Sequence, residues 1–218
     1  MSYQFPKIYP ILDASFIPVA GRVEFLRRLG GELAEAGVTL LEYRNKNGSE
    51  AELLADAEVL RAALPAGQVK LIVDDRADLV EQIGFDGVHV DSGDFSPAEA
   101  RKLLGPERIV GTFGGGAAGL LPVVAEGAAD YFSIGPVFAT RTKQTALPLI
   151  GFEGVRRLRA EASSAAGAAP VLVAIGGITL VRASEALAAG ASLVAVAGAI
   201  FRQPEPAAEF RRWLAELG

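Results

Sequence analysis

The sequence predicts a single-domain α/β fold, a (β/α)₈ TIM barrel over residues 1–218, and three observations support this fold. Short runs rich in Val, Ile and Leu recur roughly every 20 to 30 residues, and stretches with helical periodicity lie between them. Eight such runs occur, which is the number of strands that closes this barrel. No G-x-G-x-x-G fingerprint follows the first run, as a doubly wound nucleotide-binding sheet would require.

Each expected strand is a short apolar run. The strands are Ile8–Leu12, Val38–Tyr43, Lys70–Val73, Gly87–Val90, Ile109–Thr112, Tyr131–Ile134, Val171–Ile175 and Leu193–Val196. The helices expected between them place apolar residues three and four positions apart, as an amphipathic helix does. These helices are Val23–Ala36, Ala51–Leu64, Pro97–Leu104, Ala117–Glu126 and Val181–Ala189. Ser96 followed by Pro97 marks one helix start, and the hydroxyl of Thr179 is expected to cap another.

The composition excludes several classes of function. Twenty-one basic and 26 acidic side chains give a net charge of −5, which argues against general binding to nucleic acid or to a membrane surface. The absence of cysteine excludes disulfides, thiolate metal sites and a cysteine nucleophile, and it fits a reducing, cytoplasmic setting. His89 is the only histidine, so a multi-histidine zinc site is excluded. The sequence shows neither a signal peptide nor a run of about 18 apolar residues.

The second expected strand ends in charged residues. Such barrels carry their chemistry at the C-terminal ends of the strands. The two-residue period of a strand places Glu42, Arg44 and Lys46 on one side, where the two cations can meet a phosphate or pyrophosphate. The alternative is a structural Glu42–Arg44 pair with Lys46 in solvent.

Carboxylates follow the next two expected strands. Asp74 and Asp75 come directly after one, and Asp91 and Asp94 follow the other. Mg²⁺ is usually held by one or two carboxylates together with phosphate oxygens and water, so these positions can form a magnesium site. The alternative is that Asp74 and Asp94 cap the helices that follow. We expect His89, which lies within a strand, to be a packed and hydrogen-bonded residue rather than a catalytic base.

Two further regions can bind an anion. Residues Gly135–Gly151 lack a clear period and contain Thr140, Arg141, Thr142 and Lys143, so they form either a lid over an anion or an ordinary surface loop. Small residues follow the last two expected strands, at a place where these barrels bind phosphate through backbone N–H groups. These small residues are Gly176, Gly177, Ala197 and Gly198.

Taken in order, five segments resemble the thiamine-phosphate synthase family and its thiazole-tautomerase relatives over nearly the whole chain. They are Leu41–Lys46, Val73–Arg76, Asp86–Val90 followed by Asp94, Gly135–Lys143 and Ile175–Ile178. The most specific is Gly-Pro-Val-Phe-x-Thr-x-Thr-Lys. The resemblance implies a Mg²⁺-dependent transferase that joins hydroxymethylpyrimidine diphosphate to thiazole phosphate and releases pyrophosphate. It also implies small phosphorylated molecules as partners, and barrels of this kind are often homodimers.

The resemblance assigns roles to individual residues. Arg44, Lys46 and Lys143 match pyrophosphate-binding positions, and Asp75 and Asp94 match Mg²⁺ ligands. The loops that bind the pyrophosphate and the thiazole phosphate correspond to Thr140, Thr142, Gly176, Gly177, Ala197 and Gly198.

The chain departs from the family pattern at three substrate-binding positions. The family usually has Gln where Glu42 stands, Asn where Asp74 stands and Ser where Phe113 stands. Phe113 can stack on an aromatic ring or fill its place. The segment around Phe113 also lacks the histidine expected of the tautomerase branch. Two alternatives therefore stay open: a divergent relative that acts on another phosphorylated small molecule, and a non-catalytic ligand-binding barrel.

Overall fold

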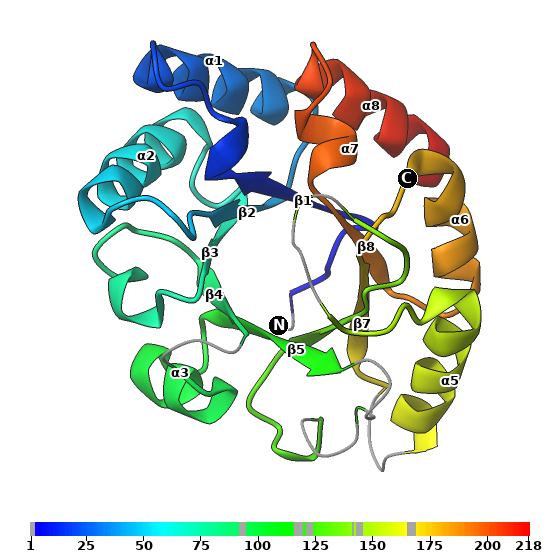
Figure 1. Ribbon diagram of the computed structural model, residues 1–218. Coiled ribbons are helices and arrows are strands. Elements are labelled where there is room, and N and C mark those ends of the chain that lie inside the picture. Colours follow the sequence, from blue (N-terminus) through cyan, green and yellow to red (C-terminus); the bar gives the residue numbers. More distant parts are fainter. Residues whose placement is uncertain are drawn as a thin grey trace.

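The eight strands form a closed barrel in the order β1 to β8, and each strand pairs in parallel with the next. The computed structural model describes residues 3–91, 95–115, 120, 124–140, 142, 146–164 and 169–218. Pairing of Ile8–Pro10 with Val194–Val196 joins β1 to β8 and closes the ring. Figure 1 looks along the barrel, with the helices arranged around the strands. The predicted fold class is confirmed.

The predicted strands are all present. They are β1 Ile8–Asp13, β2 Leu40–Arg44, β3 Lys70–Asp74, β4 Gly87–Val90, β5 Ile109–Gly115, β6 Tyr131–Ile134, β7 Val171–Ile175 and β8 Leu193–Val196. Four of them, β4, β6, β7 and β8, have the predicted bounds. β2 begins two residues later than predicted, and β5 extends three residues further. Strand position was therefore predictable from the apolar runs, whereas the strand ends depend on pairing with neighbours.

The described helices form the outer layer of the fold. They are α1 Arg22–Glu35, α2 Glu50–Ala63, α3 Pro97–Leu104, α5 Gly151–Ser164, α6 Leu180–Ala188, α7 Gly198–Phe201 and α8 Pro206–Leu217, with short 3₁₀ helices at Ala14–Phe16 and Ala77–Leu79. The sequence did not predict α5 or α8. Most of the helix expected at Ala117–Glu126 lies outside the described residues.

The two predicted helix N-termini differ in whether a side chain caps the helix. Ser96 forms a capping box with Glu99: its side chain accepts from the Glu99 N–H, and the Glu99 side chain accepts from the Ser96 N–H. Thr179 occupies the N-cap position of α6, but its side chain makes no capping hydrogen bond. The helix begins at the predicted position, but the prediction that the Thr179 hydroxyl caps it is wrong, because α6 starts without a side-chain hydrogen bond from this residue.

Side chains along a strand point alternately to its two sides, and this alternation produces two hydrophobic layers, one outside and one inside the barrel. One side of β1 contributes Ile8 and Leu12 to the layer between barrel and helices. The other side contributes Tyr9 and Ile11 to the barrel interior. The remaining buried members of that interior are Leu40, Ile72, Ile109, Tyr131, Val173, Leu193 and Ala195, with Tyr3 and Phe5 packed against them. These residues fill the barrel below the ends of the strands.

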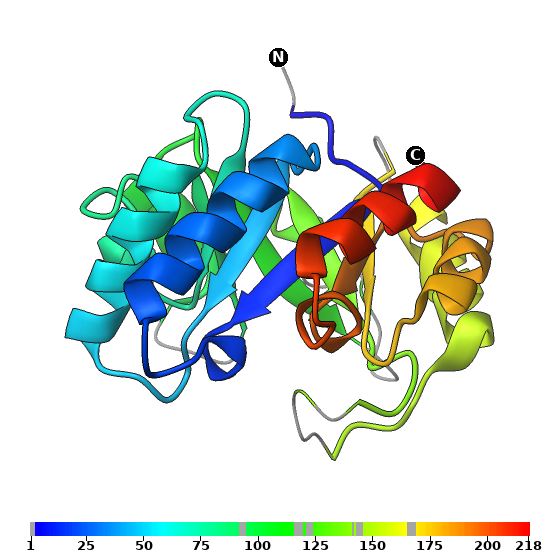
Figure 2. The ribbon, with the colours of Figure 1, turned by 90° about the horizontal axis from the view of Figure 1, so that it is seen from above.

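The two ends of the barrel differ. Figure 2 shows the first described residues and the C-terminus at one end, while the described part of the connection between β6 and α5 projects from the other. That other end is where the strands finish. Within the described residues, no helix is both long and apolar enough to cross a membrane.

Candidate functional site

A cavity of about 480 Å³ lies at the C-terminal ends of the strands. Most of the residues proposed from the sequence line it. They are Glu42, Arg44, Lys46, Asp74, Phe113, Thr140, Thr142, Gly176, Gly177, Ala197 and Gly198. Asp75 lies beside the cavity, in contact with Lys46, and is not part of its lining. Asp94, Arg141 and Lys143 lie outside the described residues. The structure therefore brings most of the predicted site residues together in one cavity. The roles of these residues in binding or catalysis stay predictions.

The cations of β2 are held by carboxylates. Arg44 pairs with Asp13, and its Nε atom lies 3.5 Å from Oδ2 of Asp74. The Nζ atom of Lys46 lies 2.9 Å from the same Asp74 oxygen and also contacts Asp75. The structural pair that the sequence left open, Arg44 with Glu42, is thus not the one formed. Instead β1, β2 and β3 together build a compact cluster of alternating charge.

This arrangement shifts the pKa values within the cluster. Partial burial lowers the pKa of the Lys46 ammonium, but the nearby charge of Asp74 and the hydrogen bond to Asp75 outweigh it, so the pKa is raised. Burial raises the pKa of Asp74, which the positive charge of Lys46 only partly offsets. Lys46 is consequently charged at neutral pH and bridges two neighbouring carboxylates.

Glu42 is a buried carboxyl group at the inner end of the cavity, where its side chain is almost inaccessible to solvent. The residue is only 3% exposed. Burial and the nearby charge of Asp74 raise the pKa of Glu42 to about 8, against the opposing effects of a hydrogen bond with Tyr9 and the charges of Arg44 and Lys46. At neutral pH the group is therefore mainly protonated, and it can donate a hydrogen bond as well as accept one.

A chain of hydrogen bonds continues from Glu42 across the barrel. The Tyr9 and Tyr131 hydroxyls are 2.8 Å apart, and Nδ1 of His89 lies 3.1 Å from the Tyr131 hydroxyl. The rings of His89 and Tyr131 also stack, with centroids 5.5 Å apart. The prediction that His89 is packed and hydrogen-bonded is confirmed. The two tyrosines were not predicted, because both lie inside strands and have the sequence pattern of ordinary core residues.

Replacing Glu42 by glutamine is expected to change how stability depends on pH. A carboxyl whose pKa is raised on folding binds more protons when folded, so wild-type stability falls as pH rises from about 4.5 to about 8. Glu42→Gln removes this contribution, because the amide does not ionise. Urea unfolding between pH 5 and pH 8.5 should show the variant gaining stability relative to wild type as pH rises.

The matched control is Glu58→Gln on α2, where the side chain is exposed. It removes a carboxyl of the same type from the surface of the protein and so serves as the reference for the effect of burial at position 42. A Glu42→Gln difference from wild type that does not change with pH would show that Glu42 ionises as readily in the folded chain as in the unfolded one.

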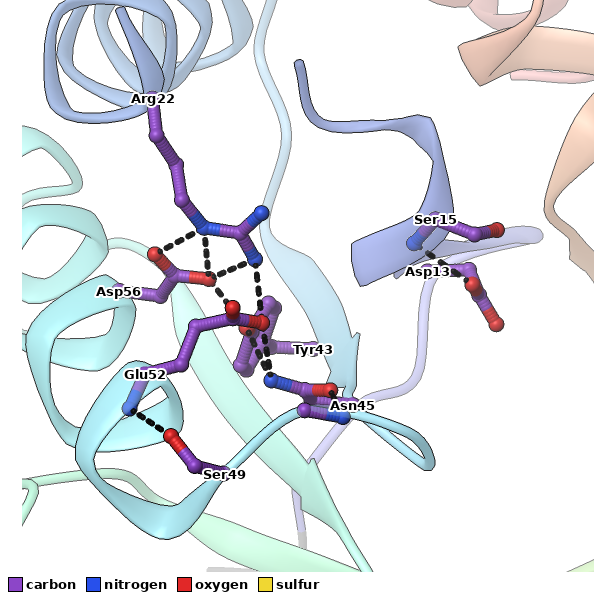
Figure 3. A network of polar contacts seen from close by, with 9 residues as sticks. Asp13, Ser15, Arg22, Tyr43, Asn45, Ser49, Glu52 and Asp56 are labelled. Carbon is purple, nitrogen blue, oxygen red and sulfur yellow. Dashed lines mark hydrogen bonds and ion pairs between the residues drawn. The ribbon is translucent and has the colours of Figure 1, made fainter. Parts of the chain in front are cut away.

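A partly buried polar network supports the segment that carries Arg44 and Lys46 (Figure 3). Asp56 on α2 accepts hydrogen bonds from Arg22 of α1, at 2.6 to 3.0 Å, and from the Tyr43 hydroxyl. Glu52, one turn earlier on α2, accepts from Arg22 at 3.1 Å and from the Asn45 amide at 3.0 Å. Because Tyr43 and Asn45 alternate with the cations, this network fixes the outer side of β2 while its inner side faces the cavity.

The loop after β6 is fastened to the end of β7. The Val137 N–H donates to the Ile175 carbonyl at 2.8 Å, and the Phe138 N–H donates to Gly176 at 2.9 Å. Gly177 has φ +61°, and a Cβ atom there would lie 2.4 Å from the Ala139 carbonyl oxygen. Only glycine fits this contact without strain. The contact holds Thr140 at the rim of the cavity.

Two arginines of the cavity lining were not predicted. Arg182 lies in the first turn of α6, and Arg202 directly follows α7. The predicted site positions are residues at strand ends, whereas both arginines come later, on or after a helix. Their side chains reach back to the cavity, which only the tertiary structure shows.

The donor set at the end of β3 is suited to a hard cation. Asp75 has φ +62°, an uncommon conformation for a residue other than glycine, and its Oδ1 accepts a hydrogen bond from the Asp91 N–H at 3.2 Å. Within the described ranges, no three His, Asp or Glu side chains gather in a way that could hold a metal without help. A carboxylate such as that of Asp75 suits a Mg²⁺ ion that takes its other ligands from phosphate and water, and the role of Asp75 as a ligand stays a prediction.

Comparisons with known proteins agree with this geometry. Residues 8–200 match the sequence model of the family described as thiamine monophosphate synthase. A thiamine-phosphate synthase of Koribacter versatilis is 40% identical over 208 residues, which cover 95% of each chain. One from Laribacter hongkongensis is 33% identical over 97% of this chain and 95% of its own. The solved thiamine phosphate pyrophosphorylase of Pyrococcus furiosus superposes with a TM-score of 0.75 at 28% identity, over 97% of this chain and 95% of that one.

Proposed function

The chain belongs to the thiamine monophosphate synthase family, and from this premise we propose that it is a thiamine-phosphate synthase. The reaction joins hydroxymethylpyrimidine diphosphate to a thiazole phosphate. The C–O bond to the diphosphate breaks, pyrophosphate leaves with the bonding electrons, and the thiazole nitrogen forms the new C–N bond. The observation that carries the proposal is one cavity that gathers the β2 cations and the small-residue loops after β7 and β8.

The residues of the cavity suit these steps. Negative charge grows on the departing pyrophosphate, so cations fixed nearby lower the barrier. Arg44 and Lys46 are fixed by Asp13, Asp74 and Asp75 before any substrate arrives, which removes the cost of ordering them during the reaction. We assign the pyrophosphate to these two residues, to Lys143 and to the Thr140 hydroxyl.

The inner part of the cavity suits the pyrimidine. Phe113 offers an aromatic face for stacking, and Glu42 and Asp74 offer hydrogen-bonding groups at the edge of a ring. A protonated Glu42 presents a donor beside an acceptor, and in this it is similar to the amide of a glutamine. This similarity supports the family reaction despite the carboxyl group at this position.

Asp75 and Asp94 are the proposed Mg²⁺ ligands. When bound, the ion neutralises pyrophosphate charge and aids its departure. Asp75 is anchored for this role by its contact with Lys46 and by the Asp91 N–H. The cysteine-free chain acting on small phosphorylated substrates fits a cytoplasmic enzyme. The expected homodimer stays a prediction.

The direct test supplies purified protein with both substrates and Mg²⁺ and measures thiamine phosphate formation against an active control enzyme. Product above background supports the proposal, whereas its absence alongside a working control overturns it. Calorimetry with pyrophosphate and Mg²⁺ then separates the alternatives, because binding without turnover indicates a relative that acts on another phosphorylated molecule.

Removal of the metal is expected to abolish this activity. Chelation with EDTA should reduce the rate to background, and excess Mg²⁺ should restore it. Asp75→Asn removes one negative ligand, so we expect the Mg²⁺ concentration for half-maximal rate to rise about tenfold or more. The control is Asp78→Asn, because Asp78 pairs with Arg76 on the outer surface. Equal Mg²⁺ requirements for Asp75→Asn and wild type would remove Asp75 from the metal site.

A further inference from the structure

The two cationic regions of the cavity differ in how their charge is balanced. Near β2, Arg44 and Lys46 face Asp13, Asp74 and Asp75. Near β7 and β8, the lining includes Arg182 and Arg202. Within the described ranges, no carboxylate lies at ion-pair distance from either of these guanidinium groups. The excess positive charge of the described lining is therefore concentrated beside the last two strands.

Arg182 is held in place by contacts that leave its charge available. Its Nη1 donates to the Gly177 carbonyl at 3.0 Å, and its Cζ lies 4.2 Å from the centre of the Phe138 ring. The ring contact orients the plane of the guanidinium, and the carbonyl bond uses one of its five N–H donors. The other donors can serve a ligand.

Arg202 is positioned in a similar way on the neighbouring loop. Its Cζ lies 5.1 Å from the centre of the Phe16 ring. A Cβ atom built on Gly198 would lie 3.2 Å from Nε of Arg202 and 3.4 Å from Oγ1 of Thr142. A guanidinium, a hydroxyl and the half-buried backbone at Gly198 thus lie close together at one side of the cavity.

We propose that Arg182 and Arg202 bind the phosphate monoester of the thiazole substrate and make the chain select the phosphorylated form over the free alcohol. The inference rests on the proposed function and deepens it. A phosphate monoester carries close to two negative charges at neutral pH. Two guanidinium groups without carboxylate partners match that charge, and their planar forks suit phosphate oxygens. The β2 cations, already partly neutralised, are left for the pyrophosphate.

The product carries the same phosphate, which gives the inference a second consequence. Thiamine phosphate should compete for the arginine pair, whereas pyrophosphate should bind at the β2 end. Weakening the pair is therefore expected to relieve inhibition by thiamine phosphate and to leave inhibition by pyrophosphate unchanged.

The test compares Arg182→Gln, Arg202→Gln and the double variant with wild type in steady-state kinetics. Each single change should raise KM for the thiazole phosphate and the inhibition constant of thiamine phosphate about tenfold or more, since each removes charged hydrogen bonds. KM for the pyrimidine diphosphate and the inhibition constant of pyrophosphate should change less than about twofold. Wild type should prefer the thiazole phosphate to its free alcohol, and the double variant should lose most of that preference.

Two controls make the outcome decisive. Arg211→Gln removes an exposed arginine from α8, away from the cavity, and should leave all these constants unchanged. Thermal unfolding checks that the variants fold, and Arg182→Lys, which keeps the charge, should recover part of the affinity. An unchanged KM for the thiazole phosphate, or an equal rise for both substrates, would overturn the inference.

The inference can fail separately from the proposed function. If wild type forms thiamine phosphate but the arginine variants behave as wild type does, only the inference is lost. If wild type forms none, the proposed function is lost, and calorimetric titration with the thiazole phosphate still tests the arginine pair. Binding that weakens in both variants supports the site, and binding that does not weaken rejects it.

Discussion

Replacement of Lys46 by methionine is expected to lower kcat/KM for thiamine phosphate formation by about 100-fold or more, the usual effect of losing one group that stabilises transition-state charge. Methionine keeps much of the side-chain length and removes the ammonium. The loss also leaves Asp74 and Asp75 without the cation that bridges them. Their mutual repulsion then adds to the repulsion between the site and pyrophosphate, so KM for the diphosphate substrate should rise as kcat falls.

The same substitution at Lys102 provides the control, because that side chain is exposed on α3. Steady-state rates and thermal unfolding should both match wild type for Lys102→Met. If Lys46→Met retained more than about a third of the wild-type kcat/KM, Lys46 would have no role in handling the leaving group.

Replacement of Asp56 by alanine is expected to reduce the free energy of unfolding by about 3 kcal/mol, in the range measured when one partner of a buried ion pair is removed. Asp56 is 2% exposed and is the shared acceptor for Arg22 and Tyr43. Without it, a guanidinium and a phenol hydroxyl are left in a poorly solvated space between α1, α2 and β2. Urea unfolding followed by circular dichroism measures the effect.

Glu58→Ala on the exposed side of the same helix is the comparison, and it should cost less than about 0.5 kcal/mol. Tyr43→Phe tests the network without removing the charge, and its cost should lie between the two. A loss of less than about 1 kcal/mol for Asp56→Ala would mean that water replaces the carboxylate and that the network does not hold β2 in place.

The fold and the position of the site could be predicted because each depends on local pattern. An apolar run such as Tyr131–Ile134 predicts a buried parallel strand, and this prediction does not require knowing which strands lie beside it. Eight such runs predict a closed parallel barrel, and the C-terminal ends of parallel strands meet at one end of the barrel. The residues that directly follow the runs are therefore expected at that end. The start of α5 was harder to detect, because it follows an aperiodic loop and has glycine at positions 151 and 154. Gly154 is required by close packing against Ile150, a contact that is not visible in the composition of the segment.

The electrostatics of the site could not be predicted, because they depend on distances between strands. The sequence places Arg44 and Lys46 at the rim but does not reveal that carboxylates from β1 and β3 reach them. Burial of Glu42 likewise depends on how the inner side chains pack, and this burial decides its protonation. Arg182 and Arg202 are charged residues on or beside helices, where most such residues face solvent, so only their folded positions distinguish them.

The packed barrel interior has a consequence for ligand traffic. Tyr3 and Phe5 pack against the inner layer from the end where the chain begins, and the Tyr9–Tyr131 pair fills the barrel beneath Glu42. Within the part of the chain that the structure describes, this end of the barrel is filled, so a molecule reaches and leaves the cavity through the rim. With the pyrimidine assigned to the depth and the thiazole phosphate to the arginines near the mouth, binding should be sequential. The diphosphate substrate enters first, and the second substrate closes the exit behind it until the new bond has formed.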